Sequence, residues 1–413
     1  MKCSDQRLIF NLLTPESVRD RCNEIFKIAK NDDLEHFQYH PKNFRFALEY
    51  VLEEFETRYP DGNFPLHSRW RHFEFGEQNL WQELFDHQSG LSSAERARRR
   101  IDLVVISVLL DAGVGPEWQY KDTETGLVFG RSEGLALASL RLVQSGVLSR
   151  YGSADPIRVD ASRLTAITPA DVAKVFQVSN TNRLSGLEER TQVLVALGDR
   201  LLMALDVFGF GEDVRPGHLF DYLVKRVDGG TVKAREILIA LLVQLRSIWP
   251  EGESIKDISV GDVGFHQRII RNDITNGILP FHKLSQWMTY SLVEPLEESQ
   301  IKVVELDSLT GLAEYRNGGL FIDTKILSLK NAEDARKAHH PKSELVVEWR
   351  ALTVALLDDL ANLLRKHMGK NCISLPLASI LQGGTWFAGR RIAKKLRLDG
   401  RSPLRIKNTG TIF

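Results

Sequence analysis

The sequence contains little cysteine and has no excess of charge of either sign. The three cysteines, Cys3, Cys22 and Cys372, lack the CxxC spacing of zinc ribbons and redox motifs. Their number and spacing argue against a disulfide scaffold and a structural zinc site, and are typical of a reducing cytoplasm. Lys and Arg together number 54, as do Asp and Glu. A broadly basic surface for nucleic acid is therefore not expected.

Long apolar runs are also missing. The longest, residues 103–110, is interrupted by Ser107 and is far shorter than the ~20 residues that span a bilayer. The N-terminal segment shows no signal-peptide pattern. We therefore expect a cytoplasmic protein without a membrane partner. With 43% hydrophobic and 26% charged residues the composition is ordinary for a globular protein, and 413 residues suggest two or three domains or one large one.

Helix signals dominate what is present. Thr14 is a predicted N-cap, because Pro15 follows at the first helical position and Glu16 lies in the first turn. Thr168 before Pro169 is a second predicted cap of this kind. Apolar periodicity and terminal Pro or Gly residues predict further helices over residues 44–59, 96–110, 135–143, 170–176, 191–208, 232–248, 282–292 and 346–367. Short strands are predicted only over residues 319–324 and 404–413, so the expected fold class is mainly α with minor β.

No internal repeat or low-complexity tract marks a domain boundary. We predict a helical N-terminal region, residues 1–160, that contributes to the pocket, and a larger helical region, residues 161–413. The alternative is one integrated domain.

Several motifs of known chemistry are absent. The chain has no phosphate-loop, HExxH or GxSxG sequence. Gly209 and Gly211 form a GxG without a preceding strand or a third glycine, which favours a helix-ending loop over dinucleotide binding. We therefore expect neither a cofactor nor a metal.

One segment gathers histidine, arginine and aromatic side chains. Residues 64–73, FPLHSRWRHF, include His67, Arg69, Trp70 and His72. The segment fits either a half-buried polar loop with cation–π stacking or the wall of a pocket for a polar ring or a sugar. A metal site is the least favoured alternative, because no further ligands stand at a defined spacing.

Carboxylates among apolar residues form a second group of candidates. Asp307 is predicted to cap a short helix that Asn317 ends, which places Glu314 within that helix. Glu348 and Arg350 lie in an apolar helix, where an internal ion pair is expected. For each carboxylate a structural salt bridge competes with a catalytic role.

Two glycine-rich segments and one lysine lie at predicted helix starts. Residues 382–391, QGGTWFAGRR, fit either an anion site made by backbone N–H groups or a packed turn. Residues 126–140 are similar, with Ser132 as a predicted cap and Arg131 beside it. Lys283 follows His282 at a third helix start, where its charge opposes the helix dipole, so it is either an exposed lysine or present for another reason.

Several strings together resemble a known family. They follow one another through nearly the whole chain and contain rare Trp and His residues: FPLHSRWRHFE, IDLVVISVLLDAGVGPEW, GRSEGLALASL, LTGLAEYRNGGLFID, ILQGGTWFAGRRIA and LRIKNTGTIF. These strings resemble the uracil-catabolism proteins of fungi and bacteria, which are grouped as a domain of unknown function. The resemblance implies a role in pyrimidine breakdown.

A second resemblance concerns the chemistry. HKLSQ over residues 282–286, LTGLAEYR over residues 309–316 and the segment 344–353 agree in order and spacing with three motifs of queuosine-salvage nucleoside glycosylases. In that family the Asp of an Ala-Asp-Tyr-Arg string is the catalytic carboxylate for N-ribosyl hydrolysis, on a helical fold similar to DNA glycosylases. The resemblance assigns that role to Glu314, and it implies a helical DNA-glycosylase-like core with an N-terminal helical extension.

The chain departs from that pattern around the presumed pocket. Glu314 replaces the Asp, His282 replaces the aromatic residue before the lysine, and Asn317-Gly318-Gly319 replaces Val-Pro-Gln. The same leaving base is therefore not expected, and the resemblance supports the reaction type more than the substrate.

These features together predict an N-ribosyl hydrolase of uracil catabolism. It would cleave the C1′–N bond of a ribosylurea-type nucleoside or nucleotide and release urea, with one carboxylate stabilising the oxocarbenium-like transition state. The predicted catalytic residues are Glu314, Lys283 and Asp307. The predicted substrate-binding residues are His67, Arg69, Trp70, His72, Arg131, His282, Tyr315, Arg316, Trp386 and Arg390.

Two alternatives stay open. A non-catalytic metabolite-binding or scaffold subunit of the same pathway would explain why Glu314 stands where the glycosylases have Asp. A nucleic-acid glycosylase is disfavoured by the neutral net charge. The expected partners are the small-molecule substrate and other enzymes of uracil degradation, and no nucleic acid.

Overall fold

The fold is that of a computed structural model, which describes residues 3–76, 78–86, 88, 90–114, 117–249 and 252–407. The chain divides into two compact units. Among the described residues, unit 1 comprises those up to His67 together with Glu253–Gln286 and Glu305–Lys407, and unit 2 comprises those within Ser68–Gly252 and Trp287–Val304. Helix α13 (Lys283–Glu297) contributes its first turn to unit 1 and the rest to unit 2. The predicted division near residue 160 falls inside unit 2.

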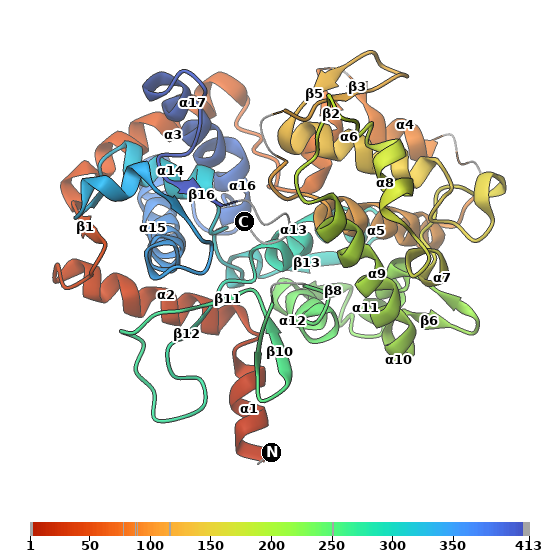
Figure 1. The fold of residues 1–413 in the computed structure, drawn as a ribbon, viewed down its shortest axis with the longest axis horizontal. Coiled ribbons are helices and arrows are strands. Elements are labelled where there is room, and N and C mark those ends of the chain that lie inside the picture. Colours follow the sequence, from red (N-terminus) through yellow and green to blue (C-terminus); the bar gives the residue numbers. More distant parts are fainter. Residues whose placement is uncertain are drawn as a thin grey trace. The chain divides into compact units, whose positions relative to one another are not determined.

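Unit 1 is built around α15 (Glu344–Met368), which is buried along most of its length. This helix packs against α2 (Pro15–Lys30) and α14 (Tyr315–Asp323), and α14 in turn packs against α17 (Trp386–Leu396) (Figure 1). The remaining described α-helices of the unit are α1 (Cys3–Asn11), α3 (Phe44–Arg58) and α16 (Leu377–Ile380).

Unit 2 has α5 (Ser93–Leu109) in its core. All residues of α5 from Ile101 to Leu109 are buried, and the helix packs against α6 (Arg131–Gln144) and α9 (Leu187–Met203). The remaining described α-helices are α4 (Leu80–Asp86), α7 (Ala161–Leu164), α8 (Pro169–Val175), α10 (Leu205–Phe208), α11 (Leu219–Val224) and α12 (Ala234–Leu245).

The described strands are short and pair only in twos. Unit 1 has β1 (Phe37–Tyr39) with β14 (Leu327–Leu329), β9 (Glu253–Ile255) with β10 (Ile258–Gly261), β11 (Val263–Phe265) with β12 (Ile278–Pro280), and β15 (Ala338–His339) with β16 (Arg405–Ile406). Unit 2 has β2 (Glu74–Phe75) with β3 (Gln78–Asn79), β4 (Tyr120–Lys121) with β5 (Val128–Phe129), β6 (Gly209–Phe210) with β7 (Asp213–Val214), and β8 (Thr231–Lys233) with β13 (Lys302–Val304). The β8–β13 and β15–β16 pairs are parallel and the others antiparallel. The predicted fold class, mainly α with minor β, is confirmed, while a likeness of the core to DNA glycosylases stays a prediction. Among the described helices, none is long and apolar enough to cross a membrane.

Two of the predicted N-cap residues, Thr14 and Thr168, are confirmed, and a third, Ser132, is wrong. Thr14 caps α2 by accepting the Ser17 N–H, and Thr168 forms a capping box with Asp171 at α8. Ser132 does not cap α6, because the helix already begins at Arg131; the Ser132 hydroxyl instead donates to a carboxylate.

The predicted strand over residues 319–324 is wrong. Residues 319–323 belong to α14 and Thr324 is its C-cap, and the α14 side chains are buried from Arg316 to Ile322. Glycine has a low helix propensity, and Phe and Ile favour strands, so the local preference of GLFID indicates a strand, and packing against neighbouring helices overrides it. The predicted strand over residues 404–413 is present at Arg405–Ile406, and its last six residues lie outside the described part of the chain.

Helix α13 runs past the proline that was expected to follow its end. Pro295 lies inside the helix and has no N–H for the carbonyl of Ser291, four residues earlier. The Trp70 indole N–H donates to that carbonyl at 2.8 Å. A side chain thus replaces the missing helical bond, so the helix continues to Glu297.

Candidate functional site

Glu314 is the N-cap residue of α14. Its backbone is extended (φ −121°, ψ 163°), and its carboxylate folds back over the first helical turn. One carboxylate oxygen accepts the Arg316 N–H at 2.7 Å and the other accepts the Asn317 N–H at 2.5 Å. These bonds satisfy two N–H groups that a helix start leaves unpaired. The prediction that a helix ends at Asn317 is therefore wrong, because α14 begins at Tyr315.

Opposing effects act on the pKa of Glu314. Burial raises it, while the N–H groups of Arg316 and Asn317 and the positive charges of Lys283 and Arg316 lower it. Burial is the largest effect, and the net shift is upward. The residue is half-buried, so part of it is still accessible. A carboxyl group in this environment exchanges its proton closer to neutral pH than a free glutamate does.

His282 and Lys283 form the start of α13. The His282 ring is buried, and its Nε2 donates to the Leu12 carbonyl at 2.9 Å. Burial lowers the pKa of His282, which keeps the imidazole neutral. Lys283 is half-buried, and its backbone N–H donates to Asp262 Oδ2 at 3.0 Å. His282 is thus bound to the backbone, whereas the Lys283 charge acts on Glu314.

Hydrogen bonds join the first two strings that resemble the glycosylase motifs, and they tie the third to α14 just after the second. The Gln286 amide donates to Thr310 Oγ1 at 2.6 Å and accepts the Thr310 N–H at 2.8 Å. From the third string, the Trp349 indole donates to the Gly318 carbonyl at 3.0 Å. The strings therefore meet in unit 1, around the segment that carries Glu314.

Asp307 lies in the short 3₁₀ helix η5 (Leu306–Ser308), and the helix that it was predicted to cap, running to Asn317, does not form. One of its oxygens accepts the Leu377 N–H at the start of α16, at 2.8 Å. The other is bonded to Arg365 of α15. The predicted capping role is therefore wrong, and the carboxylate joins α16 to α15.

Arg316 and Tyr315 occupy the first turn of α14. The Arg316 guanidinium lies 4.8 Å from the centre of the Tyr315 ring, and its Nη1 donates to the Gly400 carbonyl at 2.9 Å. Gly389 of α17 lies so near that a Cβ there would be 2.2 Å from the Arg316 carbonyl oxygen. This close approach fixes α14 against α17.

Residues 382–391 form a packed helical segment and not an anion site at a helix N-terminus. A π-helical turn, η7 (Leu381–Thr385), leads directly from α16 into α17. A Cβ on Gly383 would lie 2.6 Å from Phe55, and one on Gly384 would lie 2.3 Å from Val51. This packing fits the packed-turn alternative better. Glycine is needed here because α3 approaches the backbone closely.

Three predicted binding residues gather along this segment. His67 Nδ1 lies 2.8 Å from Gln382 Oε1, and its ring centre is 6.5 Å from that of Trp386. The Arg390 guanidinium lies 5.5 Å from the centre of the Trp386 ring. His67 is buried, while Trp386 and Arg390 are half-buried.

The other predicted binding residues belong to unit 2. Trp70 and Arg69 are both 0% exposed, and Arg69 donates to Ser107 Oγ at 2.7 Å and pairs with Asp111 at 3.1 Å. For these two side chains the polar-loop alternative fits better than a pocket wall, because neither has exposed surface. His72 packs edge-on against Trp287, with ring centres 5.6 Å apart, and Arg131 is exposed at the start of α6.

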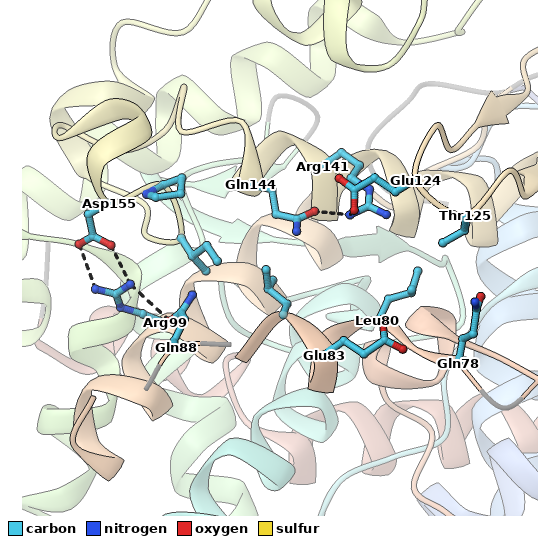
Figure 2. A pocket seen from close by; sticks show the side chains of 13 residues that line it. Gln78, Leu80, Glu83, Gln88, Arg99, Glu124, Thr125, Arg141, Gln144 and Asp155 are labelled. Atoms are coloured by element: carbon cyan, nitrogen blue, oxygen red, sulfur yellow. Dashed lines mark hydrogen bonds and ion pairs between the residues drawn. The ribbon is translucent and has the colours of Figure 1, made fainter. Parts of the chain in front are cut away.

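Unit 2 also contains a pocket of about 620 Å³ that the sequence did not indicate (Figure 2). Two ion pairs stand at its sides: Arg99 binds both oxygens of Asp155 at 2.7 and 2.9 Å, and Arg141 binds both oxygens of Asp122 at 2.7 and 2.8 Å. Both guanidinium groups are thus neutralised, and the described lining holds no other cation for a phosphate. The lining residues are Gln78, Leu80, Glu83, Leu84, Gln88, Arg99, Glu124, Thr125, Arg141, Gln144, Asp155, Pro156 and Ile157, none of them a predicted site residue.

Sequence reasoning missed Asp262. Arg350 does form the internal ion pair expected in its helix, but its partner is Asp262, at 2.8 Å to each oxygen. Glu348 instead accepts the N–H groups of His36 and Phe37 at 3.2 and 2.9 Å. No local motif marks Asp262, because its side-chain partners are 21 and 88 residues away. Across the described residues, no group of three or more His, Cys, Asp or Glu is placed to hold a metal ion.

Comparisons with known proteins extend over almost the whole chain. A family described as "Protein of unknown function (DUF1688)" matches residues 11–413. Protein urg3 of Schizosaccharomyces pombe is 35% identical over 416 residues, which cover 98% of this chain and 99% of that protein. Uracil catabolism protein 4 of Lachancea kluyveri is 34% identical over 433 residues, which cover 96% of this chain and 97% of that protein. The resemblance to uracil-catabolism proteins is confirmed, and the chain belongs to the DUF1688 family of proteins of unknown function.

Proposed function

We propose that this protein is an N-ribosyl hydrolase of uracil catabolism. The pathway is suggested by a relative named Uracil catabolism protein 4, which aligns with 96% of this chain. The reaction type is suggested by the resemblance of residues 282–286, 309–316 and 344–353 to queuosine-salvage glycosylases. The proposed substrate is ribosylurea or its 5′-phosphate, and the products are urea and ribose or ribose 5-phosphate.

The proposed reaction breaks the C1′–N bond and adds water. The electron pair of the bond moves to the urea nitrogen, and positive charge spreads over C1′ and the ring oxygen. The ionised Glu314 stabilises that charge and takes a proton from the attacking water, whose oxygen bonds to C1′. Urea is a poor leaving group without a proton, so Lys283 donates one to the departing nitrogen. Solvent then returns a proton to Lys283 and removes one from Glu314.

The position of Glu314 is the observation that carries the proposal. The Arg316 and Asn317 N–H groups fix the orientation of its carboxylate, and the Lys283 charge acts on it. Each carboxylate oxygen has two lone pairs, so the two capping bonds leave acceptor capacity for a water or a sugar hydroxyl. A fixed carboxylate suits this reaction, because the stabilisation of a transient charge depends on preorganisation.

Urea release from ribosylurea and from its 5′-phosphate tests the proposal. The purified protein should release urea from at least one of them, and the two rates identify the phosphorylation state that it prefers. Glu314→Asn is the decisive variant, because Asn is also a good N-cap and should keep α14 intact while the charge is lost. We expect turnover to fall by about 10²–10⁴-fold with little change in unfolding temperature. Full activity of Glu314→Asn would remove Glu314 from the mechanism.

A non-catalytic metabolite-binding subunit is the second candidate. It is favoured by the capping bonds, which account for the position of Glu314 without any chemistry. In that case ribosylurea or its phosphate should raise the unfolding temperature without releasing urea. The same shift should persist in Glu314→Asn.

A further inference from the structure

Asp262 lies between β10 and β11 and contacts the start of α13 at three points. Its Oδ2 accepts the Lys283 N–H at 3.0 Å, and its backbone carbonyl accepts the N–H groups of Phe281 and His282 at 3.0 and 3.1 Å. A helix start leaves its first N–H groups unpaired, and the helix dipole favours a negative charge there. Asp262 therefore holds both the chain that enters α13 and the first residue of the helix.

Arg350 in turn holds the Asp262 carboxylate. Two N–O contacts of 2.8 Å join the planar groups, and the guanidinium lies 4.1 Å from the centre of the Phe281 ring. The two side chains are only 3% and 10% exposed. A buried ion pair contributes little net stability, but a bidentate one restricts the orientation of both partners. Asp262 is thus fixed by a side chain of α15, which forms the core of unit 1.

The residue before Lys283 has a strained backbone. His282 has a φ of 50°, in the left-handed region that is unfavourable for a residue other than glycine. Its N–H is bound by the Asp262 carbonyl, its ring by the Leu12 carbonyl, and its own carbonyl accepts the Gln286 N–H at 2.9 Å. Such strain persists only where several contacts enforce it. Here it sets the direction in which α13 begins, and with it the place of the Lys283 side chain.

We infer that Asp262, held by Arg350, is a positioning residue that keeps Lys283 beside Glu314. The inference rests on the proposed function, because it gives Asp262 a part in the same reaction. Glu314 and Lys283 come from separate segments, which the Gln286–Thr310 bonds join about one turn after Lys283. Asp262 fixes the start of that turn and Gln286 fixes its end, so Lys283 is held on both sides.

A double-mutant cycle on urea release separates positioning from folding. Asp262→Asn keeps the shape of the side chain but removes its charge and its bidentate bond. We expect it to lower kcat about tenfold with KM within about twofold, and Lys283→Met to lower kcat about 100-fold. If Asp262 acts through Lys283, adding Asp262→Asn to the Lys283→Met variant should lower kcat by less than a further twofold or so. A further tenfold loss in the double variant would overturn the inference.

Asp323→Asn is the matched control. Asp323 is also buried in unit 1 and is also bound through both oxygens by an arginine, Arg397, at 2.8 and 2.5 Å, but it lies at the C-terminal end of α14. The Asp323→Asn variant should have a kcat within about twofold of the wild type. If Asp262→Asn does not fold, Arg350→Lys takes its place in the cycle, because lysine keeps the charge but cannot form the bidentate bond.

A measurement without substrate distinguishes failure of the inference from failure of the proposed function. Lysine side chains are labelled with ¹³C-methyl groups, and the Lys283 signal is identified by its loss in Lys283→Arg. Glu314→Gln should change the ¹³C chemical shift of that signal, because the charges of Glu314 and Lys283 interact. In the Asp262→Asn background this change in chemical shift should fall to about half or less. If the chemical-shift change is the same in both backgrounds, the inference is overturned whether or not urea is released. Absence of urea release by the wild type would instead remove the proposed function, and the ¹³C signal would still decide whether Asp262 positions Lys283.

Discussion

Alanine substitutions at Gly318 and Gly319, which are neighbours in α14, should change stability in opposite directions. A Cβ at Gly318 would lie 2.7 Å from Thr353 Oγ1 and 2.8 Å from the Trp349 indole. Trp349 is 1% exposed and donates to the Gly318 carbonyl, so it has no room to move aside. A Cβ at Gly319 would meet only the ring of Pro403, at 3.2 and 3.7 Å, and Pro403 is half-buried in an irregular segment that can shift.

The expected magnitudes follow from these contacts. In a helix interior, alanine makes the folded state about 0.5–1 kcal/mol more stable than glycine does. At Gly319 most of that gain should remain, so the variant should match the wild type or be up to about 1 kcal/mol more stable. At Gly318 overpacking against a rigid indole costs about 3 kcal/mol, which leaves a net loss of about 2 kcal/mol.

The Cys22 thiol provides a local assay of unit 1. It is fully buried in α2, and burial raises the pKa of the thiol far above its usual value, so it reacts only when the unit opens. The exposed Cys3 and Cys372 are first replaced by serine. When reclosing is fast, the labelling rate reports the opening equilibrium. A loss of 2 kcal/mol should speed labelling about 30-fold in Gly318→Ala, whereas Gly319→Ala should label at the wild-type rate or more slowly. Equal acceleration in both variants would refute the packing argument.

Three further predictions concern buried polar groups. Asp102→Ala should cost about 3–5 kcal/mol in guanidinium unfolding, because it leaves the 1% exposed Arg215 side chain without one of its two carboxylates; a loss below 1 kcal/mol would contradict this. Burial alone would raise the pKa of Glu95, but Arg215 and the neighbouring arginines lower it to about 2. Stability should therefore fall by about 3 kcal/mol as pH drops from 4.5 toward 2, and Glu95→Gln should remove most of that slope. Thr385→Val should lower the free energy of unfolding by about 1–3 kcal/mol, because the Asn317 amide oxygen loses a buried 2.9 Å hydrogen bond. Thr385→Ser keeps the hydroxyl and should keep that bond. Equal free energies of unfolding for the two variants would contradict a stabilising role of the bond.

The sequence predicted helices best where local capping determines them. Thr14 and Thr168 can be identified as caps because their side-chain oxygens bond to N–H groups three residues away. Such bonds form without any distant contact. Periodicity also located α3 and α15 nearly to their ends. Glu314 was missed as a cap, since it is longer than the residues that usually cap helices. The helix that follows it was missed because two adjacent glycines and the Leu-Phe-Ile run favour other local structure, which tertiary packing overrides.

The candidate site could be predicted only as a set of strings. Order and spacing brought Glu314 and Lys283 into one hypothesis, but the bonds that join their segments link Gln286 to Thr310, which are 24 residues apart. The partner of Arg350 was missed because an ion pair 88 residues apart has no sequence signature. Trp70 was considered for a pocket wall, since an aromatic residue beside arginines indicates a binding surface. Its actual partner, the Ser291 carbonyl, becomes free only because Pro295 interrupts the α13 bonding pattern.

The length of the Glu314 side chain bears on the choice between catalysis and capping. A cap alone is served as well or better by Asp, Asn, Ser or Thr, so capping does not call for glutamate here. The additional methylene instead sets how far the carboxylate lies from the backbone, which matters when the group faces a reacting atom. Glu314→Asp should therefore keep the unfolding temperature while lowering urea release at least about tenfold, and Glu314→Asn should lower it further. If Glu314→Asp retains full activity, the distance of the carboxylate from the backbone has no catalytic importance. If instead the unfolding temperature falls in both variants, the glutamate contributes to the stability of α14 beyond its two capping bonds.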